Sequence, residues 1–255
     1  MEIMRQIEAE LYSLDGILPG GDEFNTRYAS YRTGRTTTYV FSDEHLFREA
    51  MSLLSQYGLK ATTFYIFKLN QDEINAYPAI YIGIHNINGL LIDDRVNESQ
   101  LGQAEMAKDY QSERIVVTPR VKNLLESMSR GLKWEPVEGM AGQEFFSMSV
   151  VEDLPEPIVV PSPVYIGPNE YPPGTYAVQS DGRDVITNAN IAKLKDVGIA
   201  VSEDVKVKEK VMKWRPRLIA SGEIAHALQS AKVKGLLEPI SPLIPETHPL
   251  SSLDS

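Results

Sequence analysis

One short unit, a strand followed by a capped helix, a glycine and a second strand, occurs three times along this chain. The copies span residues 38–67, 114–137 and 217–240. In each copy, β-branched or aromatic residues precede a polar N-cap residue, an amphipathic segment and a glycine. The apolar face of such a helix must pack on a sheet. The repeat therefore predicts an α/β (α+β) fold with mixed sheets, built from related βαβ-like units.

The second and third copies agree most closely. Their shared features are the N-cap residue (Thr118 and Ser221), the glycine that ends the helix (Gly131 and Gly235) and a closing Glu-Pro-apolar triplet (residues 135–137 and 238–240). The rules common to all βαβ units would explain the caps and glycines, whereas the triplet favours duplication. We predict that strands 115–117 and 218–220 occupy equivalent places, with the same strand order around them.

The repeat also suggests how the chain is divided. We expect an N-terminal α/β lobe over residues 1–138. Residues 139–255 would form an acidic, β-rich segment and a C-terminal βαβ lobe. Two related lobes and one continuous globule both remain open, because 255 residues are long for one compact domain and sufficient for two smaller ones.

Periodicity predicts elements outside the repeats as well. Residues 2–14 are expected to form a helix, since Ile3, Ile7, Leu11 and Leu14 would share one face. The remaining predictions are a hairpin of strands 80–84 and 90–92 around Asn88-Gly89, helices over residues 97–110 and 188–196, and a basic strand region over residues 205–217.

Three bulk properties limit the function classes. The chain has no Cys, which excludes disulfides, thiolate catalysis and Cys-ligated zinc. Its net charge of −10 argues against nucleic acid as a partner, because phosphate neutralisation supplies much of the affinity of nucleic-acid binders. No apolar run approaches the ~20 residues that span a bilayer, and the N-terminus lacks signal-peptide character. We expect a cytoplasmic protein with no membrane partner.

No residue pattern indicates a catalytic centre or a cofactor site. The four His residues are scattered along the chain. One weak pattern resembles the acid and lysine arrangement of metal-dependent nucleases, namely Asp181 and Asp184 upstream of Asp204 and Lys206. We expect no bound metal, no cofactor and no enzymatic activity, with a metal-dependent nuclease or hydrolase as the alternative.

The stretch from residue 134 to residue 182 has the most distinctive surface character. It is acidic, contains no Lys or Arg, and holds half of the chain's prolines. Aromatic side chains among acids suit an interface with a basic protein, although the same aromatics could be sheet core. The predicted partner-binding residues are Glu144, Phe145, Glu152, Asp153, Glu156, Tyr165, Glu170, Tyr171 and Asp181. The basic strand over residues 205–217 is the second candidate surface.

The closing unit, KWRPRLIASGEIAHALQSAKVKGLLEPISPL, resembles the C-terminal signature of cytoplasmic immunity proteins from bacterial polymorphic-toxin and contact-dependent systems. The matching positions are Ser221, Leu228, Gly235 and Pro239. One branch of these proteins, the double-CxxCG immunity-like proteins, also carries an earlier copy of the unit, as residues 114–137 do here. This chain departs from that branch in having no Cys, so the CxxC metal pairs are absent.

The resemblance implies a non-enzymatic inhibitor that neutralises a cognate bacterial toxin by occluding it. The partner would be a protein toxin, of basic character if the acidic stretch forms the contact. A phage or mobile-element adaptor that binds a host protein is a further alternative. The sequence leaves the toxin's identity and the oligomeric state open.

Overall fold

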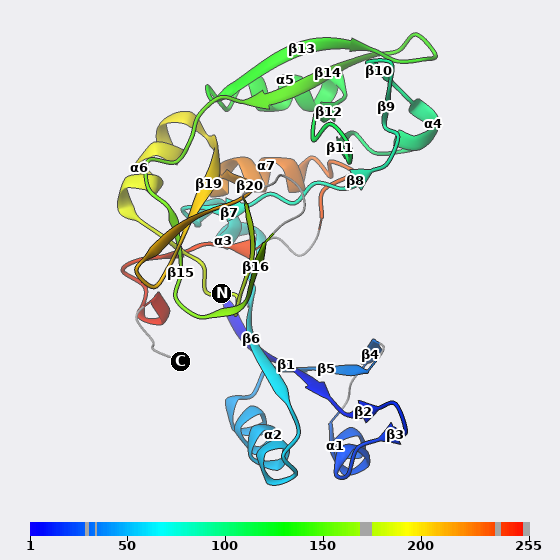
Figure 1. The fold of residues 1–255 in the computed structure, drawn as a ribbon. Helices are drawn as coiled ribbons and strands as arrows, with labels where there is room; N and C mark the ends of the chain where they lie inside the picture. Colours follow the sequence, from blue (N-terminus) through cyan, green and yellow to red (C-terminus); the bar gives the residue numbers. More distant parts are fainter. Residues whose placement is uncertain (29–30, 34, 169–174, 238–240, 252–255) are drawn as a thin grey trace.

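The computed structural model describes residues 1–28, 31–33, 35–168, 175–237 and 241–251. Strands make up 42% of the chain and helices 25%, in mixed sheets, so the predicted α+β class is confirmed. Figure 1 shows a small N-terminal unit, which β1 (Glu2–Glu10) and β6 (Ala61–Lys68) join to a larger body.

All three repeats form the same arrangement of four strands and one helix. In the first, β4 (Tyr31–Thr33), β5 (Thr36–Phe41), α2 (Glu44–Gln56) and β6 follow one another along the chain. The strand order is β4-β5-β1-β6, so β1 is inserted between β5 and β6. Because β1 is antiparallel to both neighbours, β5 and β6 run parallel to each other.

The second repeat reproduces this order in the five-stranded sheet. It comprises β11 (Met106–Asp109), β12 (Ile115–Val117), α5 (Pro119–Glu126) and β13 (Leu132–Glu138). The inserted strand is β14 (Glu144–Val150), which is antiparallel to both β12 and β13. β8 (Asn86–Ile87) adds a parallel edge strand beside β11.

The third repeat lies in the largest sheet. It comprises β19 (Ile199–Val207), β20 (Lys210–Ala220), α7 (Gly222–Ser230) and β21 (Ser241–Pro242). Here the inserted strand is β7 (Ile80–Tyr81), antiparallel to both β20 and β21. The strand order around 115–117 therefore matches that around 218–220, as predicted. The closing triplet at residues 238–240 lies outside the described residues.

The predicted N-terminal helix is wrong, because residues 2–10 form a central strand. β1 pairs along most of its length with β5 on one side and β6 on the other. Ile7, Ala9 and Leu11 are buried at the alternating spacing of a strand, whereas Leu14 is 85% exposed. The spacing of the apolar residues fits both the period of a helix and the period of a strand. Hydrogen bonding to two neighbouring strands therefore decides that this segment forms a strand. The unit continues with β2 (Tyr12–Ser13), β3 (Gly16–Ile17) and α1 (Gly21–Arg27).

The predicted hairpin over residues 80–92 is also wrong. Its first strand, β7, belongs to the third repeat. The nearby hairpin instead joins β9 (Leu91–Ile92) to β10 (Arg95–Val96). Its turn residues, Asp93 and Asp94, both have positive φ angles, 48° and 59°, as a two-residue hairpin turn of this type requires.

The predicted helix over residues 97–110 is largely wrong. Only α4 (Glu98–Leu101) is helical there, and β11 follows it. Met106 and Ala107 are buried where β11 pairs with β12, so sheet pairing overrides the local helical pattern. The predicted helix over residues 188–196 is confirmed as α6 (Asn188–Val197).

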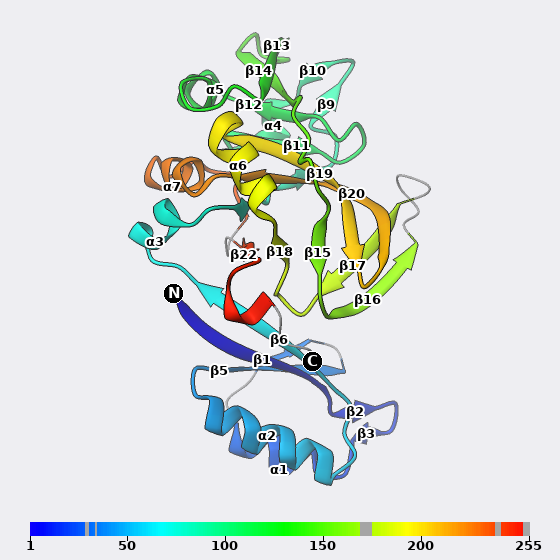
Figure 2. The same cartoon turned by 90° about the vertical axis from the view of Figure 1, so that its left-hand side faces the viewer.

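The largest sheet curls around the middle of the body, as Figure 2 shows. Its order is β16-β17-β20-β19-β15-β18-β22, with β7 paired to β20 and β21 paired to β7. The remaining elements are β15 (Ile158–Val160), β16 (Pro163–Pro168), β17 (Tyr176–Ser180), β18 (Val185–Ile186), β22 (Ile244–Pro245), α3 (Gln71–Ala76) and the short 3₁₀ helix at Pro249–Ser251.

Strand pairing crosses the expected boundary between residues 138 and 139. That position falls at the end of β13, which pairs with β14 over its whole length. β7, from the N-terminal half, completes the third repeat. One hydrophobic core also spans the second and third repeats, because Val121 and Leu125 of α5 belong to the same buried cluster as Ile224 and Leu228 of α7. No described helix is long and apolar enough to cross a membrane.

Candidate functional site

Two of the predicted partner-binding residues are buried and cannot contact a partner directly. Phe145 is 4% exposed and packs with Val116 and Val137 in a hydrophobic cluster. Asp181 is 7% exposed, and its carboxylate lies 2.6 Å from the guanidinium of the buried Arg183. The alternating pattern that places Phe145 in β14 directs its side chain into the core.

The other described members of that set lie on β14, on the segment between β14 and β15, and on β16. Glu144 is exposed at the start of β14, directly opposite Glu138 of β13. Glu152 forms an ion pair of 2.5 Å with Lys193 of α6, and Asp153 and Glu156 are exposed nearby in the sequence. Tyr165 is 55% exposed on β16. Glu170 and Tyr171 lie outside the described residues.

The alternative nuclease residues do not assemble into a metal site within the described part of the chain. Asp184 is buried and accepts a hydrogen bond from Tyr81, and Asp181 pairs with Arg183. Asp204 lies on β19 and forms an ion pair of 3.2 Å with Lys213. No three His, Asp or Glu side chains come together among the described residues in a way that could hold a metal ion.

A groove of about 1040 Å³ lies between the second and third repeats. One wall consists of β11, β14 and the turn that follows β11, and the other consists of β20 and the segment that follows β7. Its lining combines apolar side chains with charged ones. The apolar group comprises Tyr81, Ile82, Ile84, Ile115, Met148, Val150, Val201, Leu218 and Leu237.

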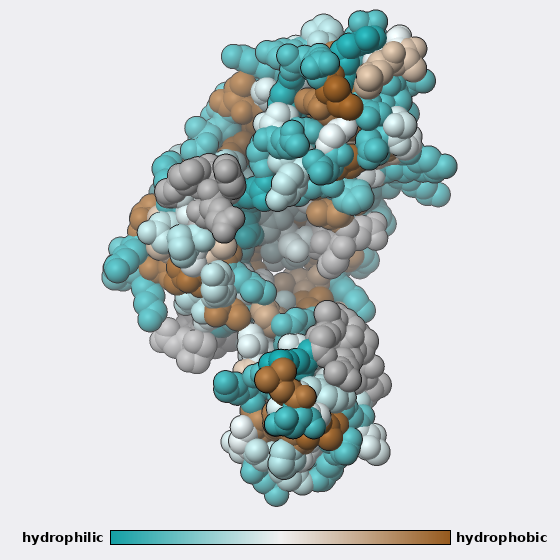
Figure 3. Space-filling model, turned by 45° about the vertical axis from the view of Figure 1, so that its right-hand side comes forward, coloured by the Kyte–Doolittle hydropathy of each residue, from teal (hydrophilic) through white to brown (hydrophobic). Residues whose placement is uncertain are grey.

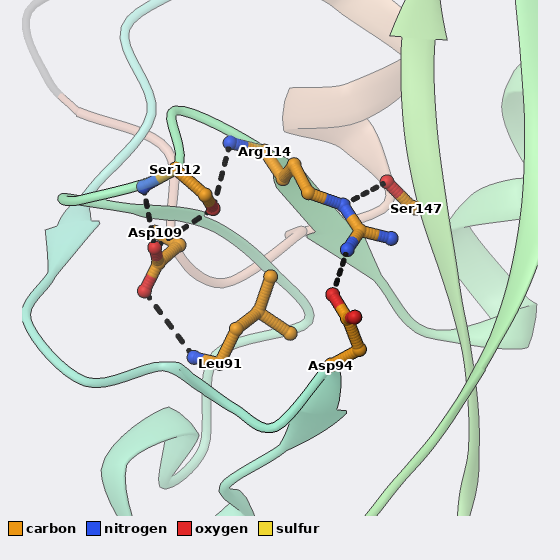
Figure 4. A network of polar contacts seen from close by, with 6 residues as sticks. All are labelled: Leu91, Asp94, Asp109, Ser112, Arg114 and Ser147. Atoms are coloured by element: carbon orange, nitrogen blue, oxygen red, sulfur yellow. Dashed lines mark hydrogen bonds and ion pairs between the residues drawn. The ribbon is translucent and has the colours of Figure 1, made fainter.

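The first wall is held by a network around Asp109, which is 2% exposed. Its carboxylate accepts hydrogen bonds from the Leu91 N–H at 3.2 Å and from the N–H and hydroxyl of Ser112, both at 2.8 Å (Figure 4). Burial opposes ionisation, but these hydrogen bonds outweigh it and lower the pKa of Asp109. Asp109 therefore fixes the turn over residues 109–114.

This turn presents Arg114 and Glu113 to the groove. The guanidinium of Arg114 donates to Asp94 at 2.8 Å and to the Ser147 hydroxyl at 3.3 Å, as Figure 4 shows. Glu113 has a φ of 61°, in the left-handed region that non-glycine residues rarely adopt. The turn thus positions one cation and one carboxylate at the groove wall.

Glu113 connects the two walls. Its carboxylate forms ion pairs with Lys108 of β11 and with Arg215 of β20. Burial opposes its ionisation, but the hydrogen bonds from Lys108 and Arg215 outweigh that effect and lower the pKa of Glu113. The Nε atom of Arg215 is itself buried and has no hydrogen-bond partner among the described residues.

At its other end, the groove reaches the side chain of Arg217. This guanidinium stacks 4.2 Å from the centre of the Trp214 ring and lies 3.9 Å from the Asp184 carboxylate. Burial raises the pKa of Asp184, and burial and the adjacent Asp184 carboxylate raise the pKa of Tyr81 well above its usual value. Arg217 also lines two smaller hollows, of about 310 and 230 Å³.

The groove differs in charge from the chain as a whole. The described residues that line it include four cations, Lys108, Arg114, Arg215 and Arg217, and one carboxylate, that of Glu113. Two further carboxylates lie beside these cations, because Asp94 pairs with Arg114 and Asp184 lies 3.9 Å from Arg217. The whole chain carries a net charge of −10. On the face shown in Figure 3, apolar residues form small groups among hydrophilic ones, with no single broad apolar surface.

Sequence reasoning identified only part of this site. The basic strand region supplied Arg215 and Arg217, and Pro216 between them marks a point where regular pairing is interrupted. No local signal could join that strand to Glu113, which lies 102 positions earlier. In comparisons with protein-family models, curated proteins and solved structures, nothing matches this chain.

Proposed function

We propose that this chain is a cytoplasmic, immunity-type protein that binds a cognate bacterial protein toxin and neutralises it by occlusion. The observation that carries the proposal is the groove between the second and third repeats. It has a volume of about 1040 Å³ and combines an apolar lining with four cationic side chains. Such a surface suits a segment of another protein, since interfaces combine apolar anchors with charges that set orientation.

The C-terminal repeat, which carries the resemblance to immunity proteins, supports the proposal. Its strand β20 forms one wall of the groove. Ser221 caps α7 by accepting a hydrogen bond from the Ile224 N–H at 3.5 Å, and Leu228 lies on the buried face of the same helix. Two residues of the signature thus stabilise the helix that directly follows the strand bearing Arg215 and Arg217.

The decisive experiment uses the gene next to this one. If it encodes a secreted protein with a C-terminal toxin domain, that domain is expressed in cells with and without this chain. We expect the chain to restore growth and to co-purify with the toxin domain. Growth that stays arrested, with no complex isolated, would contradict the proposed function.

Matched variants test whether the contact lies on the groove. Ser149 is exposed and lines the groove, so Ser149→Arg fills it with a bulky side chain. Ser55 is exposed on α2 in the first repeat, and Ser55→Arg adds the same side chain far from the groove in the sequence and in the fold. We expect Ser149→Arg to lose protection and Ser55→Arg to keep it.

A further inference from the structure

We infer that the groove between the second and third repeats binds an extended segment of a partner protein in which acidic and apolar side chains alternate, and that Glu113 occupies the place of one partner carboxylate. The inference deepens the proposed function, on which it rests, by naming the chemistry of the bound segment. It depends on the arrangement of charges, on the described gap in pairing at residues 215–217 of β20 and on the geometry of Glu113.

The charges select an acidic occupant. Four cationic side chains line the groove among the described residues, and three carboxylates, those of Glu113, Asp94 and Asp184, lie beside them, within an otherwise acidic chain. Two of these cations, Lys108 and Arg215, already hold a carboxylate, that of Glu113. A cation that forms an ion pair with the Glu113 carboxylate can form the same kind of ion pair with a glutamate or aspartate of a partner.

The strand pairing favours an extended occupant. β20 pairs with β17 only at Trp214 and with β7 at Ile219 and Ala220. Between these points no backbone pairing of residues 215–217 is described on that edge of β20. Pro216 has no N–H to donate, so an extended segment that lies across this three-residue gap is held mainly by its side chains, which point alternately to the groove lining and away from it.

The lining favours a polypeptide over a nucleic acid. Apolar side chains line the groove together with the cations, among them Ile82, Ile115, Met148 and Leu218. Such a lining suits a strand that carries apolar side chains at alternate positions. A nucleic acid would gain most of its affinity from phosphate contacts, and the net charge of −10 opposes them. Binding of a nucleic acid is therefore an outcome that the experiment must exclude.

Glu113 acts as an internal substitute for the partner's carboxylate. It adopts a left-handed backbone conformation, with a φ of 61°, to reach both Lys108 and Arg215. An incoming carboxylate has to compete with it for the same two cations. Removing the charge of Glu113 should therefore strengthen binding of an acidic segment, whereas removing Arg215 should weaken it.

The test measures binding of labelled peptides to the full chain by fluorescence anisotropy. The probe is an alternating Glu-Val peptide of about eight residues, roughly 26 Å when extended. Matched peptides carry Ser or Lys in place of Glu, and a single-stranded oligonucleotide of similar length is the fourth probe. We expect the Glu-Val peptide to bind most tightly, with an affinity that falls as salt rises.

Two variants and one control decide the roles of the groove residues. We expect Arg215→Gln to weaken binding of the Glu-Val peptide about tenfold and Glu113→Gln to strengthen it about three- to tenfold. Arg130→Gln is the control, because Arg130 is 86% exposed and outside the groove, and it should change nothing. Circular dichroism and thermal unfolding verify that each variant is folded.

Three results would overturn the inference. The first is a Ser-Val or Lys-Val peptide that binds as tightly as the Glu-Val peptide. The second is tighter binding of the oligonucleotide. The third is a folded Glu113→Gln protein that binds the Glu-Val peptide less tightly than the wild type. Growth protection does not enter these measurements, so a failure of the proposed function is separable from a failure here.

Discussion

The Tyr81 hydroxyl donates a hydrogen bond of 2.9 Å to the Asp184 carboxylate, although 103 positions separate the two residues. Tyr81 belongs to the strand inserted into the third repeat, and Asp184 directly precedes β18. The contact thus joins a strand from the N-terminal half to the C-terminal sheet. It also holds the carboxylate that lies 3.9 Å from Arg217 at the end of the groove.

Replacing Asp184 with Asn should change how stability depends on pH. Burial raises the folded-state pKa of Asp184, so the folded protein binds a proton more tightly than the unfolded chain does. The wild type should therefore lose stability relative to Asp184→Asn as pH rises from the ordinary Asp pKa through the raised one. Urea unfolding of both proteins at about pH 4 and pH 7 measures this. Equal differences at the two pH values would contradict the prediction.

Two of the helix caps should respond differently to substitution. Asp43 accepts hydrogen bonds from the N–H groups of His45 and Leu46, at 2.7 and 3.2 Å, so Asp43→Ala should cost about 1 kcal/mol of unfolding free energy. Thr118 occupies the N-cap of α5, but its hydroxyl is buried without a hydrogen-bond partner among the described residues. Thr118→Val should therefore be neutral or stabilising. Chemical denaturation of both variants provides the comparison, and a Thr118→Val loss as large as that of Asp43→Ala would refute it.

Gly58 directly follows the C-cap of α2, whereas Gly235, which the sequence predicts as the end of a helix, lies four residues beyond the C-cap of α7. The two glycines should differ in their tolerance of alanine. Gly58 has a φ of 64° and open space around its Cα, so Gly58→Ala should cost only the backbone strain, about 1 kcal/mol. Gly235 has a φ of 104°, and a Cβ there would overlap the backbone oxygen of Met106. Gly235→Ala should lower stability by more than about 2 kcal/mol. Thermal unfolding of the two variants tests this, and a Gly235→Ala midpoint close to that of Gly58→Ala would contradict the prediction.

The exposed acids can be tested for a role in steering a basic partner. Reversing Glu152, Asp153 and Glu156 to Lys should slow association with the toxin domain and leave the protein folded, because partly exposed charges contribute little to stability. The effect should shrink at high salt. Stopped-flow association at two salt concentrations is the measurement. Equal association rates for the wild type and the triple variant would show that these acids are solvated surface charges with no role in steering the partner.

The sequence by itself determined the repeated unit. Thr118, Pro119 and the apolar positions of α5 are local signals, and so are Ser221 and the face of α7, because capping and amphipathic periodicity act within a few residues. The same local signals misled at residues 2–14, where the spacing of Ile7 and Leu11 fits a helix as well as a strand. Pairing with β5 and β6 decided that case, and no local pattern contains information about such pairing.

Only the tertiary structure decided where the charged residues meet. The acidic stretch reads as one surface along the chain, yet the fold buries Phe145 and Asp181 and distributes the exposed members over separate elements. The insertion of β7 beside β20 and the packing of the second repeat against the third bring Glu113 and Arg215 together. A contact between residues so distant in sequence depends on how the sheets pack, since each side chain by itself is an ordinary exposed charge.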